Sequence, residues 1–389
     1  MFQTGLDVFL SRHYRRYRGL RLGVVCHPAS LNKSLVHIGE LITQTKLGLD
    51  ITCFFGPQHG IRGEKQDNMV ESKDFSDSKT SLPVVSLYST VREPNEKHLK
   101  NIDAFVIDLQ DIGTRIYTFI YTMANCMRVA KKHGKKVIVL DRPNPINGVS
   151  IEGNVLESKF ASFVGQYAIC TRHGMTIGEL AQMFNQHFGI HCDLDVIPML
   201  GWKRTYFDDD IRGLWVPPSP NIPNLDSALL FPGTVLFEGT NVSEGRGTTR
   251  PFEWIGAPFI DPDSLCHELN KRKLPGVFFR PIYFQPTYQK YKDVVCGGAH
   301  IHILDRKKFN AFWSGLVLLS QIKRMYGDSF QWKQPPYEYE YEKLPVDLIA
   351  GTDMLRKAVE NPAQMREFKS VVSSDRAAFS KMRKEFLLY

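Results

Sequence analysis

Short apolar runs alternate with helical patterns through the first half of this chain, and the alternation limits the folds available to it. The apolar runs lie at residues 22–26, 51–55, 84–88, 104–108, 137–140 and 194–197. Apolar residues spaced as on one face of a helix follow several of these runs. Buried strands that alternate with amphipathic helices are typical of a parallel sheet covered on both faces. We therefore predict an α/β protein whose first domain is Rossmann-like, with a parallel sheet.

The alternation weakens after a proline-rich stretch at residues 215–232. Proline fixes φ and removes a backbone donor, so we expect neither a helix nor a central strand there. Further strand and helix patterns follow at 277–284, 299–303, 307–324 and 352–359. A chain of 389 residues is also longer than the usual single core. We predict a Rossmann-like domain at residues 1–228 and a smaller α+β domain at residues 229–389.

Three of the predicted strands run directly into polar residues. Ligands of open α/β sheets bind beyond the carboxyl ends of the strands. The pattern therefore predicts one shared edge that carries Gln58, His59, Asp108, Asp111, Asp141 and Arg142. For Asp108 and Asp111 a structural alternative stays open, because a short acceptor side chain can also cap the helix that follows.

Residues 237–250 form another polar segment, with two carboxylates, two guanidinium groups, four small hydroxyls and three glycines. Glycines let a backbone adopt positive φ and approach a ligand closely. A surface loop can have the same composition, so this segment alone does not separate a binding site from a loop. The other motifs of the chain are needed to interpret it.

Six motifs follow one another at residues 55–63, 108–115, 141–145, 172–179, 217–221 and 237–250. Each is weak alone, but their order resembles that of the exo-β-N-acetylmuramidase family (NamZ-like proteins), over nearly the whole chain. The resemblance implies a glycoside hydrolase that releases N-acetylmuramic acid from the non-reducing end of peptidoglycan fragments. We expect the active cleft at the interface of the two domains, where pockets commonly form.

The first motif departs from the family pattern at Gln58, where the family normally has the glutamate suspected of catalysis. An amide cannot serve as an acid or as a carboxylate base at neutral pH. Three outcomes stay open: another carboxylate substitutes, the acetamido group of the substrate takes part, or activity is lost. Glu64 is a possible replacement, although a surface ion pair with Lys65 is the simpler explanation of that residue.

Sugar hydrolysis usually needs two carboxyl groups beside the scissile bond, and Glu244, flanked by glycines, is our preferred second carboxylate. The predicted catalytic set is therefore Glu244, Glu64, Gln58 and His59. The sugar expected from the resemblance carries a lactyl carboxylate, a group that arginine binds in a bidentate manner, and Arg115 and Arg246 are our choices for it. The predicted substrate-binding set is Arg62, Asp108, Asp111, Arg115, Arg142, His173, Asn241 and Arg246.

Two other functions stay open: a non-catalytic muropeptide-binding protein and a hydrolase of another anionic N-acylated sugar. The formal charge of +8 suits an anionic partner, but no basic tract favours nucleic acid. No local histidine chelate predicts a metal site, and no glycine-rich nucleotide loop follows the first strand. We expect a small anionic amino-sugar or muropeptide substrate, no metal and no cofactor.

Seven widely spaced cysteines without a Cys-x-x-Cys pair indicate a reducing compartment. The first residues lack a signal-peptide pattern, and no apolar run reaches the roughly 18 residues of a membrane span. We expect a cytoplasmic protein without a membrane partner, although many members of the family act outside the cytoplasm. The sequence makes no prediction of the oligomeric state.

Overall fold

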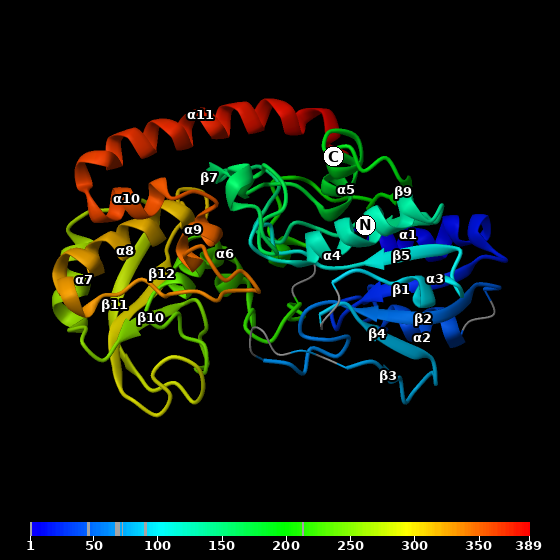
Figure 1. The fold of residues 1–389 in the computed structure, drawn as a ribbon, viewed down its shortest axis with the longest axis horizontal. Helices are drawn as coiled ribbons and strands as arrows, with labels where there is room; N and C mark the ends of the chain where they lie inside the picture. The colour runs from blue at the N-terminus through cyan, green and yellow to red at the C-terminus, as the bar shows by residue number, and fades with distance from the viewer. Residues whose placement is uncertain (1, 45–46, 67–70, 72, 89–91, 212–213) are drawn as a thin grey trace.

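The larger sheet of the protein is a twisted, mostly parallel sheet (Figure 1). The computed structural model describes residues 2–44, 47–66, 71, 73–88, 92–211 and 214–389. Within them the strands run in the order β3-β4-β2-β1-β5-β6-β9. Their bounds are β1 (Arg21–Cys26), β2 (Asp50–Gly56), β3 (Phe75–Ser76), β4 (Pro83–Ser86), β5 (Ala104–Asp108), β6 (Lys136–Leu140) and β9 (Asp193–Ile197). All neighbours pair in parallel except β3 with β4. The Rossmann-like sheet is confirmed, and each predicted apolar run overlaps one strand.

Helices cover both faces of this sheet. They are α1 (Gly5–Val8), α2 (Ile38–Gln44), α3 (Glu96–Leu99), α4 (Phe119–Lys132) and α5 (Ile177–Gln186). Successive residues of a strand point to opposite faces, so Val24 of β1 packs in the core with α1 and α2. Its neighbour Val25 packs in the other core, which contains α4 and α5 and continues into the second domain.

The second domain has an antiparallel sheet, in the order β10-β12-β11. Its main elements are α6 (Leu225–Thr234), β10 (Trp254–Ala257), α7 (Pro262–Asn270), β11 (Val277–Phe284), β12 (Cys296–Ile303) and α8 (Ala311–Tyr326). Helices α6 and α8 cross at Gly233 and Gly315, where a Cβ on Gly233 would lie 1.9 Å from the carbonyl oxygen of Ala311. The smaller α+β domain that the sequence predicted is therefore confirmed.

The proline-rich stretch is a partial error of the sequence prediction, because α6 begins at Leu225 and contains Pro232. Asn224 caps the helix by accepting a hydrogen bond from Ser227 N at 2.8 Å. Proline removes one backbone bond at a cost of about 3 kcal/mol. The helix is buried over most of its length against α8, and that packing outweighs the loss. The predicted domain boundary at residue 228 falls inside α6 and stays a prediction.

The last part of the chain returns to the first domain. It contains α9 (Pro345–Ala350), α10 (Met354–Glu360) and the long helix α11 (Met365–Arg383). In Figure 1, α11 crosses above both domains and packs on the small antiparallel pair β7 (Glu152–Val155) and β8 (Cys170–Arg172). Among the residues described, no helix is long and apolar enough to cross a membrane.

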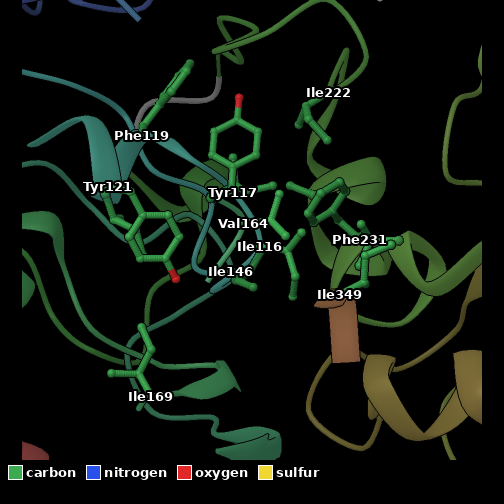
Figure 2. Packing of buried hydrophobic residues seen from close by; sticks show 14 of the residues in the cluster. Ile116, Tyr117, Phe119, Tyr121, Ile146, Val164, Ile169, Ile222, Phe231 and Ile349 are labelled. Carbon is green, nitrogen blue, oxygen red and sulfur yellow. The ribbon is translucent and has the colours of Figure 1, made fainter. Parts of the chain in front are cut away.

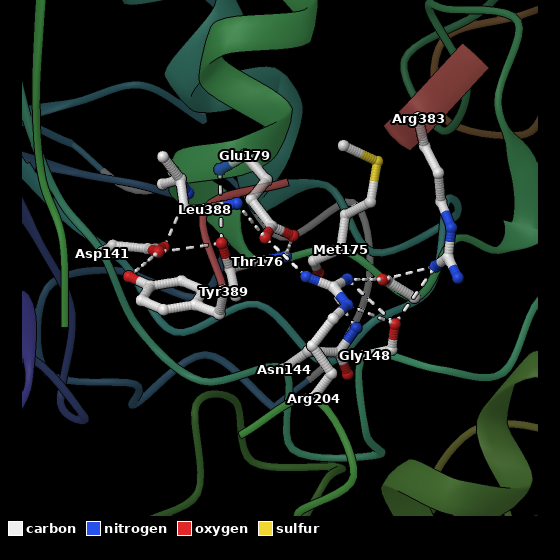
Figure 3. Close-up of polar contacts among 12 residues, drawn as sticks. Asp141, Asn144, Gly148, Met175, Thr176, Glu179, Arg204, Arg383, Leu388 and Tyr389 are labelled. Carbon is white, nitrogen blue, oxygen red and sulfur yellow. Dashed lines mark hydrogen bonds and ion pairs between the residues drawn. The ribbon is translucent and has the colours of Figure 1, made fainter. Parts of the chain in front are cut away.

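The two C-terminal residues complete a buried polar network (Figure 3). The hydroxyl of Tyr389 donates to Asp141 Oδ2 at 2.7 Å and accepts from Met199 N at 2.7 Å. The backbone N–H of Leu388 donates to Glu179 Oε1 at 2.9 Å. Asp141 also accepts from Thr176 Oγ1 at 2.8 Å, so the end of the chain and the start of α5 share one carboxylate. Both structural elements therefore use the Asp141 carboxylate as a hydrogen-bond acceptor.

Candidate active site

A narrow pocket lies between the two domains. The first domain contributes Gln58 and His59, which follow β2, and the second contributes Glu238, Arg246 and Glu338. The space that the centres of water molecules could occupy in it is about 40 Å³, and all its empty space, including that open to solvent, is about 460 Å³. The pocket has room for a few water molecules, so a sugar ring would also use the space open to solvent.

One wall of this pocket is apolar (Figure 2). Ile116, Tyr117 and Val164 from the first domain lie opposite Ile222 and Phe231. The hydroxyl of Tyr117 is buried beside Ser219, but no hydrogen bond of good geometry to the described protein atoms forms there. A buried donor without a partner costs about 1–3 kcal/mol, so Tyr117 is a candidate contact for a polar ligand group.

Both ends of the Gln58 amide form hydrogen bonds, one within the first domain and one to the second. The hydroxyl of Thr118 donates to Gln58 Oε1 at 2.7 Å, and Gln58 Nε2 donates to Glu338 Oε1 at 3.3 Å. The neighbouring His59 has Nδ1 2.7 Å from the carbonyl oxygen of Lys65. Both residues are buried in the pocket lining, as expected for side chains at the carboxyl end of β2.

Glu338 has neutral partners at both carboxyl oxygens. Tyr88 donates its hydroxyl to Oε2 at 2.7 Å, and the amide of Gln58 contacts Oε1. Within the described part of the chain, Glu338 forms no ion pair with a lysine, arginine or histidine. Burial raises the pKa of Glu338, and the charge of Glu238 raises it further, against the hydrogen bond from Tyr88. These surroundings favour the protonated form of Glu338 more than exposure to water would.

Glu238 has the opposite environment. Arg246 Nη2 donates to Glu238 Oε1 at 2.7 Å, and the hydroxyl of Tyr337 donates to Oε2 at 2.7 Å. Burial alone would raise the pKa of Glu238, but the charge and hydrogen bond of Arg246 hold it below the usual value. The pocket thus contains one glutamate that favours its acid form and one that favours its ionised form.

Arg246 keeps one nitrogen available for a ligand. Its Nε lies 3.3 Å from Glu244 Oε1, and its Nη1 is buried without a hydrogen-bond partner in the described structure. Glu244 itself pairs with Lys290 Nζ at 2.8 Å and does not line the pocket described here. Glu244 therefore pairs with Arg246 from outside the pocket lining, and the acid role predicted for Glu244 stays a prediction.

Three pocket residues have backbone angles that side chains rarely adopt. His59, Phe252 and Glu338 have φ of 72°, 65° and 46°, and Tyr339 next to Glu338 has 68°. Non-glycine residues with positive φ cost of order 1–3 kcal/mol each and cluster at functional sites. Their concentration in one pocket is an argument for function that does not depend on residue type.

Four other predicted site residues, Asp108, Asp111, Arg142 and His173, are buried in close polar pairs. With the further buried pair Glu152 and Arg172, we call these three pairs the rim cluster. Asp108 receives Arg142 Nε at 2.5 Å and Nη2 at 2.7 Å. Glu152 pairs with Arg172 at 2.5 Å, and Asp111 lies 3.2 Å from His173 Nε2. Each carboxylate therefore has a cation or an imidazole beside it. The substrate-binding roles predicted for Asp108, Asp111, Arg142 and His173 stay predictions.

The remaining predicted residues lie elsewhere. Arg115 Nη2 donates to the carbonyl oxygen of Ala350 at 2.8 Å and links the first domain to α9. Arg62 pairs with Asp77 at the surface at 2.7 Å. Glu64 is exposed and lines a separate hollow beside β2 and β4. Asn241 is tied to the backbone of residues 329 and 331. The structure does not bring these four to the pocket, and their roles stay predictions.

Sequence reasoning missed Glu338, Tyr88 and Tyr337. Glu338 belongs to the run Pro-Pro-Tyr-Glu-Tyr-Glu-Tyr at residues 335–341, where two prolines precede alternating aromatic and acidic residues. That repeat is the one local signal that could have singled it out. No cluster of three or more metal-ligating side chains occurs among the described residues.

Comparison with known proteins extends over the whole chain. Two family models match it, described as exo-beta-N-acetylmuramidase NamZ, N-terminal, over residues 22–226 and C-terminal over residues 229–389. The peptidoglycan beta-N-acetylmuramidase NamZ of Bacillus subtilis (strain 168) is 42% identical over 387 residues, which are 100% of this chain and 91% of that protein. Two crystal structures of DUF1343 family proteins from Bacteroides fragilis NCTC 9343 also match. One has a TM-score of 0.88 at 32% identity and the other 0.76 at 26%, each over 100% of this chain and 99% of its own.

Proposed function

The chain belongs to the exo-β-N-acetylmuramidase NamZ family, and we propose that it releases N-acetylmuramic acid from the non-reducing end of peptidoglycan fragments. Membership of that family was the interpretation drawn from its six motifs, and it is confirmed. The protein is accordingly a glycosidase of the exo-acting β-N-acetylmuramidase type, and its substrate is a small anionic amino sugar or muropeptide.

The observation that carries this proposal is the pair of glutamates with opposite environments in one pocket. Glycoside hydrolysis needs one carboxyl group that is protonated and one that is ionised. Enzymes create such pairs by environments that push two pKa values apart. Glu338, among neutral partners, fits the protonated role, and Glu238, paired with Arg246, fits the ionised role.

The pocket also offers groups for the rest of the sugar. Arg246 Nη1 is a buried guanidinium nitrogen without a partner among the described atoms, which suits the lactyl carboxylate. Gln58 and His59 line the floor beside it and can orient the sugar ring and its acetamido group. Tyr117 adds a hydroxyl on the apolar wall. These roles are our assignments for the binding step.

The test compares two chromogenic substrates that differ only in the lactyl group. We expect the purified protein to release nitrophenol from 4-nitrophenyl β-N-acetylmuraminide and far less from the matching N-acetylglucosaminide. Equal turnover of both sugars would contradict specificity for the lactyl carboxylate and favour a broader N-acyl sugar hydrolase. Binding of muropeptides without turnover of either substrate would identify a non-catalytic binder, which Gln58 makes the second candidate.

We also propose that the protein works in the cytoplasm, on fragments that are recycled from the cell wall. All seven cysteines are buried free thiols, as is common in reducing compartments. Cell fractionation with an antibody to the protein tests this location. Recovery outside the cytoplasmic fraction would contradict it.

A further inference from the structure

We propose that Glu338 is the general acid of the reaction and takes the role that Gln58 cannot fill. This inference rests on the proposed muramidase function and names the residue that donates the proton. Glu338 lies in the pocket, and its carboxyl oxygen is one hydrogen bond, 3.3 Å, from Gln58 Nε2. Because glutamine and glutamate have the same shape, the carboxyl group of Glu338 stands beside the place where a glutamate at position 58 would put its own.

The position of Glu338 is fixed by a tight turn. Tyr337 and Glu340 exchange two backbone hydrogen bonds of 2.9 Å, and both residues between them have positive φ. This is the pattern of a type I′ hairpin turn, which favours asparagine and glycine. A glutamate and a tyrosine occupy it here, although asparagine or glycine would adopt these angles with less backbone strain. Its effect is to project the Glu338 side chain into the pocket.

The contacts of Glu338 suit a proton donor. A general acid must keep its proton at the working pH and be held within reach of the leaving oxygen. The hydroxyl of Tyr88 and the chain from Thr118 through Gln58 hold both carboxyl oxygens without a positive charge in contact. The charged groups that face it are Glu238, which favours protonation, and Arg92, stacked 4.2 Å from the Tyr88 ring, which opposes it. Burial adds to the effect of Glu238.

The step balances with water as the only co-reactant. The O–H bond of Glu338 breaks as its proton moves to the glycosidic oxygen. The bond from the anomeric carbon to that oxygen breaks, and its electron pair stays with the leaving alcohol. Water ends with its hydroxyl on the anomeric carbon and its proton on the enzyme, which restores Glu338.

The test uses two substrates with different leaving groups. One is the disaccharide in which N-acetylmuramic acid is linked to N-acetylglucosamine, and the other is the 4-nitrophenyl muraminide. A sugar alcohol needs a proton to leave, whereas nitrophenolate leaves without one. For Glu338→Gln we expect kcat/KM to fall about 10²- to 10⁴-fold on the disaccharide and much less on the nitrophenyl sugar. Glu342→Gln, the same change at an exposed position nearby, is the matched control.

A second variant adds a readout that a structural role would not move. Tyr88→Phe removes a hydrogen bond that stabilises the ionised form of Glu338. Activity that needs the protonated form is lost as pH rises through the pKa of Glu338. In Tyr88→Phe the high-pH limb of the pH–activity profile should therefore shift to higher pH. Gln58→Glu places a second carboxyl beside Glu338 and should shift the limb in the same direction. If Glu338→Gln does not fold, these two profiles decide the question.

The outcomes separate this inference from the proposed function. An active wild type in which Glu338→Gln loses the same factor on both substrates overturns Glu338 as the acid and leaves the muramidase function intact. An active wild type whose high-pH limb stays unchanged in Tyr88→Phe and Gln58→Glu also overturns it. An inert wild type that Gln58→Glu makes active contradicts both, because the acid would then be lost at position 58.

Discussion

The interface pocket and the rim cluster are both buried and polar, but the carboxylates in them have partners of different charge. In the rim cluster Asp108, Asp111 and Glu152 each have an arginine or histidine within 3.2 Å. In the pocket Glu338 has only a phenol and an amide in hydrogen-bond contact among the described residues. Burial without a cation in contact raises the pKa of Glu338. Burial with neutral partners does not by itself make a proton donor, since Asp141 also has only neutral donors and is enclosed by the fold, whereas Glu338 lines the pocket.

The largest effect should come from breaking a rim pair. Arg142→Ala leaves Asp108 as a buried charge without its guanidinium, and such losses cost about 3–5 kcal/mol of unfolding free energy. Denaturant unfolding measures the change. Arg62→Ala, at a surface pair with Asp77, should cost less than about 1 kcal/mol. Equal losses for the two variants would break the comparison.

Next in size is the effect of the pocket arginine on substrate choice. Arg246→Lys keeps a positive charge beside Glu238 but loses the planar fork with its unpaired Nη1. A hydrogen bond to a charged group is worth about 1.5–3 kcal/mol, so kcat/KM for the muraminide should fall roughly 10- to 150-fold. The preference over the N-acetylglucosaminide should shrink by the same factor. Arg250→Lys, an exposed control, should keep that preference.

The C-terminal contact should have an intermediate effect on stability. Tyr389→Phe removes the donor to Asp141 and the acceptor for Met199 N. We expect a loss of about 1–3 kcal/mol in thermal or denaturant unfolding. Tyr341→Phe, at an exposed hydroxyl, should leave the unfolding free energy unchanged. If Tyr389→Phe is as stable as the wild type, the hydrogen bonds of Tyr389 to Asp141 and Met199 do not stabilise the fold.

The smallest expected effect distinguishes two tyrosines of the same core (Figure 2). The hydroxyls of Tyr117 and Tyr121 are buried beside Ser219 and the backbone of Gln166, and neither forms a hydrogen bond of good geometry to the described atoms. Only Tyr117 is among the residues that line the pocket. Either change to phenylalanine should leave stability equal or higher by up to about 1 kcal/mol. Only Tyr117→Phe should also raise KM. A rise in KM for Tyr121→Phe as well would point to general disturbance of the core.

Much of the fold could be predicted from the sequence because its signals are local. Strands β5 and β6 contain continuous apolar runs, and Thr176 with Glu179 forms a capping box at the start of α5, a pattern that lies within four residues of the sequence. The end of β2 also placed Gln58 and His59 in the pocket. Signals of this kind need only neighbouring residues.

The rest of the site depends on partners that lie far apart in the chain. Glu338 meets Gln58 across 280 positions, and its turn lacks the asparagine or glycine that marks such turns in a sequence. Residue type alone also did not reveal which arginine is occupied. Arg115 donates to carbonyl oxygens at Ile349 and Ala350 away from the pocket, whereas Arg246 is one of the residues that line it.

The path of α11 has a consequence for the order of assembly. Asp141 follows the fifth parallel strand in the chain, but one of its hydrogen-bond donors is the side chain of Tyr389, the residue at the opposite end of the sequence. Asp141 therefore acquires this donor only after the chain has been synthesised beyond α11 and that helix has packed across the first domain.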